Sequence, residues 1–158
     1  MHIYHQDARI FLNKNKKKYD AVYIDAFTAH ASIPYHLTTI EAIEKIYNSL
    51  NENGVVLLNI IGSLEGKNSR FLKAEHKTYA SFFPQVFLFP VWGVDDENLV
   101  QNIILIALKS ESENIFEKEN LEFQGFLNNL WDKTITTKLP ILTDDFAPVD
   151  YYALSLVL

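Results

Sequence analysis

The chain has 158 residues, 48% of them hydrophobic and 13% aromatic, and a formal net charge of −6. This composition favours a single domain, residues 1–158, with a buried core, and the absence of cysteine excludes disulfides, thiolate catalysis and cysteine-bound zinc. The acidic balance argues against sequence-independent nucleic-acid binding, and no apolar run approaches the roughly 20 residues of a membrane span, so we expect a soluble cytoplasmic protein.

The first part of the chain alternates short apolar runs with helical patterns. Residues 2–6 predict a short strand, residues 8–14 a short helix, and residues 19–24 a strand that is buried on both faces. Residues 26–35 predict a loop, in which Pro34 fits a turn.

A longer helix is expected from Thr38 because Ile40, Ile43 and Ile46 recur with a helical period. Thr38 or Thr39 is expected to cap its start, and Gly54 is expected just past its end. The continuous apolar run at 55–61 then predicts a strand in a sheet covered on both faces.

The remaining chain continues the same alternation before it ends in a turn-rich segment. The patterns predict a helix at 69–83 stopped by Pro84, strands at 86–91 and 100–108 around a loop at 92–98, a helix at 117–133, and turns at 142–152.

Two of the early strands deliver a carboxylate at their C-terminal ends, Asp7 and Asp25, and this layout is typical of α/β nucleotide-binding domains. We therefore expect an α/β fold with a partial Rossmann-like sheet of the class I methyltransferase type. This sheet should be mostly parallel with an antiparallel final strand pair, and should lack the first βαβα unit, where a glycine-rich cofactor loop belongs.

Several segments in order resemble the spermidine/spermine synthase family. They are DARIFL at 7–12, YDAVYIDAF at 19–27, IPYHLTT at 33–39, NGVV at 53–56 and LTDDFAPV at 142–149. The resemblance spans nearly the whole chain but only the C-terminal two-thirds of the family's catalytic domain.

The resemblance implies S-adenosylmethionine or its decarboxylated form as a substrate, with Asp7, Ala8 and Pro34 at the cofactor. Asp7 matches the carboxylate that binds the exocyclic amine of adenine, a donor that suits an acceptor-only group. An alternative interpretation is that Asp7 caps the following helix, and both can hold at once.

Asp25 matches the family's proposed general base, which would accept a proton from a small-molecule amine as the amine attacks the sulfonium-activated carbon. The alternative is a strand-end aspartate that satisfies loop amides. The family usually has a second aspartate three residues later, where this chain has Thr28, and so a diamine acceptor is in doubt.

The other polar clusters favour structural roles. Asp144 and Asp145 are adjacent in an extended segment and point apart, so we expect them to hold the tail over the sheet rather than share a metal. The five histidines have no metal-ligand spacing on one helix, and we expect no metal cofactor.

These observations leave open an aminopropyl-transferring or methyl-transferring enzyme, a non-catalytic remnant or assembly module, and a piece of a longer enzyme. Without its first strands the sheet would have an unpaired edge that needs cover. We expect a homodimer formed through that edge or by exchange of the N-terminal strand, with a monomer whose edge is capped by residues 2–6 as the alternative.

Overall fold

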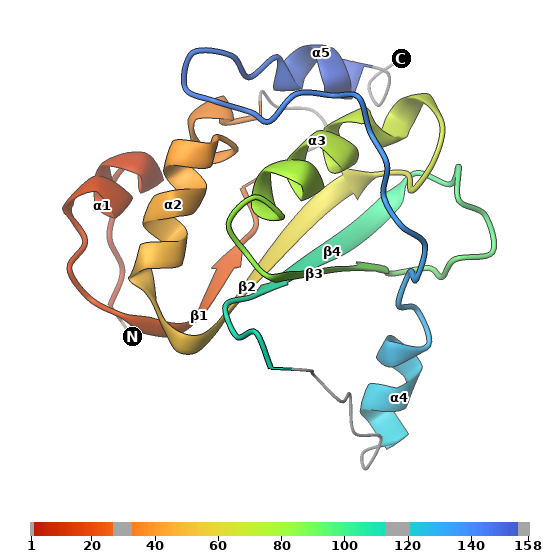
Figure 1. Ribbon diagram of the computed structural model, residues 1–158, viewed down its shortest axis with the longest axis horizontal. Coiled ribbons are helices and arrows are strands. Elements are labelled where there is room, and N and C mark those ends of the chain that lie inside the picture. Colours follow the sequence, from red (N-terminus) through yellow and green to blue (C-terminus); the bar gives the residue numbers. More distant parts are fainter. Residues whose placement is uncertain (1, 27–32, 113–120, 155–158) are drawn as a thin grey trace.

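The computed structural model describes residues 2–26, 33–112 and 121–154, in which four strands form one sheet with the order β1–β2–β4–β3 (Figure 1). β1 pairs in parallel with β2, whereas β4 is antiparallel to both β2 and β3. Three of the four strands therefore share a direction, and the α/β sheet with an antiparallel final pair is confirmed. The strands are β1 Tyr19–Ile24, β2 Leu50–Gly62, β3 Gln85–Pro90 and β4 Gln101–Leu108.

The helices gather mainly on one side of the sheet, where Figure 1 shows α1, α2 and α3 together and α4 apart from them, below the strands in this view. α5 was not predicted. The predicted helix at 117–133 is seen as the shorter α4, and residues 117–120 lie outside the described part. The helices are α1 Ala8–Lys14, α2 Ile40–Ser49, α3 Arg70–Tyr79, α4 Leu121–Leu127 and α5 Val149–Ala153, with 3-10 turns η1 Tyr35–Leu37 and η2 Lys67–Ser69.

α2 begins as the sequence indicates but ends earlier. The Thr39 side chain accepts a hydrogen bond from the Ala42 amide, which confirms an N-cap, and Ile43 and Ile46 are buried. The expected C-terminal role of Gly54 is wrong, because β2 starts directly at Leu50 and contains this glycine. A Cβ at Gly54 would lie 2.8 Å from the Leu50 Cβ, so the close approach of the Leu50 side chain favours a glycine there.

The core lies between the helices and one face of the sheet. Val56, Leu58 and Ile60 of β2 are fully buried, and they pack in one cluster with residues of α2, α3 and β4. The intervening residues of β2 are only half-buried. The expectation that both faces of this strand are covered is therefore wrong, because the described helices that pack on β2 lie on one face.

β1 is at the edge of the sheet, with β2 as its only strand partner among the described residues. The expectation of a strand buried on both faces is wrong, since Tyr23 is 62% exposed. Residues 2–6 form no strand and are exposed. The predicted strand is wrong there, because no backbone in the described part of the chain supplies the ladder of hydrogen bonds that a strand needs.

The C-terminal tail packs over the helices rather than over the sheet. The Leu142 carbonyl accepts a hydrogen bond from the Ile40 amide at the start of α2. Val149 and Tyr152 of α5 are buried in the core cluster, next to α3. The tail thereby closes the side of α2 and α3 that the sheet leaves open.

Candidate functional site

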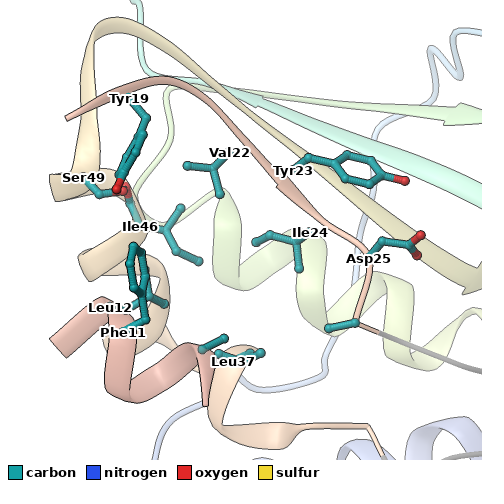
Figure 2. Close-up of a pocket in the computed structure, with 12 residues that line it drawn as sticks. Phe11, Leu12, Tyr19, Val22, Tyr23, Ile24, Asp25, Leu37, Ile46 and Ser49 are labelled. Carbon is teal, nitrogen blue, oxygen red and sulfur yellow. The ribbon is translucent and has the colours of Figure 1, made fainter. Parts of the chain in front are cut away.

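An apolar groove with a volume of about 300 Å³ runs along β1, between this strand and helices α1 and α2. Figure 2 shows Val22 and Ile24 directed towards Leu37 and Ile46, while Tyr23 and Asp25 point away from these two side chains. We call it the β1 groove. It is lined by Ala8, Phe11, Leu12, Tyr19, Val22, Tyr23, Ile24, Asp25, Ala26, Leu37, Ile46 and Ser49.

Asp25 follows the last residue of β1 and, among the described residues, is the only acidic side chain that lines the β1 groove. The side-chain amide of Asn59, on the neighbouring strand β2, donates a hydrogen bond of 3.0 Å to its Oδ1. Tyr23 of β1 pairs with Leu57 of β2. Asp25 and Asn59 each lie two residues further along, so their side chains are at matching positions. Asn59 therefore orients Asp25, and no other side chain in the described ranges donates a hydrogen bond to this carboxylate.

Asp7 is the N-cap of α1, since its Oδ1 accepts a hydrogen bond of 3.0 Å from the Ile10 amide. Its Oδ2 lies 3.2 Å from Nε2 of His36. The hydrogen bond from Ile10, together with the nearby His36, lowers the pKa of Asp7. The capping interpretation is confirmed, and it is compatible with adenine binding because each carboxylate oxygen can accept more than one hydrogen bond.

The structure brings some of the expected site residues together but not all of them. Ala8, the first residue of α1, lines the β1 groove with Asp25, whereas Asp7 and Pro34 are not among the lining residues. Pro34 precedes η1, and its carbonyl accepts a hydrogen bond from Leu37. Thr28 lies outside the described residues.

Sequence reasoning missed the partners of the two aspartates. Asn59 is the one polar residue in the apolar run 55–61, and this interruption is the signal that could have identified it. His36 is one of the five histidines without metal-ligand spacing. It lies 29 positions from Asp7 in the sequence, so no local pattern indicates that the two side chains pair.

The described ranges contain neither a candidate metal site nor a candidate membrane span. No three histidine, aspartate or glutamate side chains come together there as a metal site. None of the helices in those ranges has the length and apolar character required to cross a membrane.

The chain is similar to known proteins in its structure rather than in its sequence. No protein-family profile matches the sequence, and no curated protein matches it either. The fold is similar to a probable spermidine synthase from Corynebacterium glutamicum, with a TM-score of 0.60 and 19% identity, over 94% of this chain and 50% of that one.

Two further solved structures show the same relation. A spermidine synthase in complex with the transition-state analogue AdoDATO has a TM-score of 0.55 and 17% identity, over 95% of this chain and 45% of that one. The spermidine synthase from Thermotoga maritima has a TM-score of 0.53 and 15% identity, over 96% and 48%. The chain thus has a spermidine synthase-like fold and spans half or less of the length of the synthases it matches.

Proposed function

We propose that this chain is the part of an aminopropyltransferase-like protein that holds the adenine end of decarboxylated S-adenosylmethionine and presents Asp25 to an amine. The observation that carries the proposal is the position of Asp25 at the C-terminal end of β1, where Asn59 orients it at the border of an apolar groove. In open α/β sheets, ligands bind outside the carboxyl ends of the strands.

The chemistry of the reaction suits such a carboxylate. An amine attacks only when its nitrogen is unprotonated, and a nearby carboxylate can hold the ammonium and then take its proton. The nitrogen forms a bond to the carbon next to the sulfonium, and the carbon–sulfur bond breaks and leaves a neutral thioether. Asp25 would accept the proton that the nitrogen loses.

The adenine end of the ligand would meet Asp7 and Ala8 at the start of α1. The Asp7 carboxylate is already held by the Ile10 amide and by His36, so the adenine amino group would add a further donor or displace His36. S-adenosylmethionine, with methyl transfer in place of aminopropyl transfer, would use the same adenine contact.

A non-catalytic assembly module is the second candidate. Two observations favour it: β1 is an open edge among the described strands, and the chain spans half or less of the synthases that it matches. The homodimer and the cytoplasmic location expected from the sequence stay predictions.

Calorimetric titration with methylthioadenosine tests the proposal, and Asp7→Ser is the variant of choice. Serine is a good N-cap, so the variant keeps α1 capped while it removes the carboxylate. We expect binding to the unchanged chain, and about a tenfold weaker affinity for the variant because a hydrogen bond to a charged group is lost.

Asp20→Ser is the matched control, because Asp20 lies on the same strand as the site and binds Asn51 instead. Its affinity should equal that of the unchanged chain. No heat of binding at millimolar ligand, or equal affinities for Asp7→Ser and the unchanged chain, would refute adenine recognition by Asp7 and favour the assembly module.

A further inference from the structure

The two edges of the sheet differ. The outer edge of β3 is partly occupied, since Leu88 forms a bridge with Trp131, whose amide donates a hydrogen bond of 2.9 Å to the Leu88 carbonyl. The outer edge of β1 has no such neighbour in the described part of the chain. A free edge carries unpaired N–H and C=O groups and is a template for another strand.

Exposed apolar side chains lie on β1, on α1 and in the segment before α1. Tyr23 of β1 is 62% exposed and Ile10 of α1 is 47% exposed. Tyr4 is 61% exposed, and its ring lies 5.9 Å from that of Phe11, which lines the β1 groove. α1 itself buries no residue. A cluster of this kind beside an open edge is typical of an interaction surface.

The charges at the two ends of β1 are opposite. Lys16, Lys17 and Lys18 directly precede the strand, and Asp25 directly follows it. An identical strand added in parallel would place like charges side by side, whereas an antiparallel strand places the basic end of each copy against the acidic end of the other. The charge pattern of β1 is therefore complementary to itself in the antiparallel orientation.

The register follows from the geometry of antiparallel pairs. In an antiparallel pair, two residues that face each other either both direct their N–H and C=O groups towards the partner strand or both direct them away from it. A two-fold axis between two identical strands therefore lies where a residue faces its own copy. Centring on Ala21 puts Tyr19 opposite Tyr23 and Lys17 opposite Asp25. The side chain of Asn15 binds both the amide and the carbonyl of Lys17 and so fixes the position of Lys17 near the start of the strand.

We propose that β1 pairs antiparallel with β1 of a second copy of this chain about a two-fold axis at Ala21, and that Lys17 of each copy pairs with Asp25 of the other. The two four-stranded sheets then form one continuous sheet. The proposal does not rest on the amine chemistry above. In the paired state, the ammonium of Lys17 occupies the position of an amine substrate, so pairing and amine use are alternative states of Asp25.

Sedimentation equilibrium of the ligand-free chain over a range of concentrations tests the pairing. We expect a dimer whose dissociation constant rises about tenfold or more in Lys17→Asp and in Asp25→Lys, because each change creates two like-charge contacts per dimer. The double variant Lys17→Asp/Asp25→Lys restores the opposite charges and should return to within about threefold of the unchanged chain.

Lys16→Asp is the matched control, since it changes the net charge equally at a position that does not face Asp25. A monomer at all concentrations, equal weakening by Lys16→Asp, or no recovery in the double variant would overturn the proposal. Hydrogen exchange gives a second readout that needs no variant, because the alternate amides of β1 that point to the outer edge of the sheet should exchange more slowly as concentration rises. These experiments contain no adenosyl ligand, and their failure would leave the adenine titration unaffected.

Discussion

At the scale of single residues, the most unusual group is Glu75 on α3. The residue is fully buried, and neither of its carboxylate oxygens has a hydrogen-bond partner among the described residues. Burial raises the pKa of Glu75 well above its usual range, because a carboxylate loses its hydration there. Burial also raises the pKa of the Tyr79 hydroxyl well above its usual range. The Glu75 carboxyl, one turn earlier on α3, raises this pKa further.

The raised pKa makes stability depend on pH in a defined direction. Below about pH 4.5 the carboxyl of Glu75 is protonated in both the folded and the unfolded chain, and the full stability is present. As the pH rises, the unfolded chain ionises first, and the free energy of unfolding falls until the pH reaches the pKa in the folded chain. The buried carboxyl therefore destabilises the protein at neutral pH.

We predict that Glu75→Gln raises the free energy of unfolding by about 1 kcal/mol or more at neutral pH, and that this gain shrinks towards about pH 4.5. Urea unfolding at a series of pH values measures it. Glu44→Gln, at an exposed position of α2, is the matched control and should not show this trend. A gain for Glu75→Gln that is the same at every pH would contradict the raised pKa.

At the scale of secondary-structure elements, one polar network ties the tail to the first two helices. The Arg9 guanidinium of α1 contacts the Asp144 carboxylate at 2.5 Å and the Thr39 hydroxyl at 3.1 Å. The Thr39 hydroxyl in turn donates to Asp144 at 2.6 Å while it caps α2. Asp144 thus holds side chains at the starts of two helices, and the tail lies over these helices rather than over the sheet as the sequence indicated.

We predict that Asp144→Asn lowers the free energy of unfolding by about 1–2 kcal/mol, because charge-assisted hydrogen bonds to Arg9 and Thr39 are weakened. The half-exposure of Asp144 keeps the loss below that of a buried pair. Asp145→Asn, at the adjacent exposed position, is the control for the change in net charge. Equal losses for the two variants would show that the network contributes nothing specific.

The elements that could be predicted from sequence are those with a strong local signal. The period of Ile40, Ile43 and Ile46 identified α2, and the apolar runs identified β2 and β4. The burial of β1 could not be predicted, because YDAVYI has the same pattern in the middle of a sheet and at its edge. α5 was missed because Val149–Ala153 is short and is held by packing on α3.

At the scale of the whole molecule, the candidate site was only partly predictable. Asp25 could be found because it ends an apolar strand, and Asp7 because it begins a helix. Their partners Asn59 and His36 come from other elements, so only the folded chain brings them together. The same holds for the β1 groove, because its lining residues come from α1, β1, η1 and α2.

The open groove and the two aspartates together make the central claim testable in one experiment. NMR titration of the isotope-labelled chain with methylthioadenosine, followed by a diamine, reports the place of each ligand even when binding is weak. We predict amide shifts at Asp7 and Ala8 with the nucleoside, and at Asp25 and Asn59 with the amine. Shifts elsewhere, or none at millimolar ligand, would contradict the assignment of this edge of the sheet as the binding site.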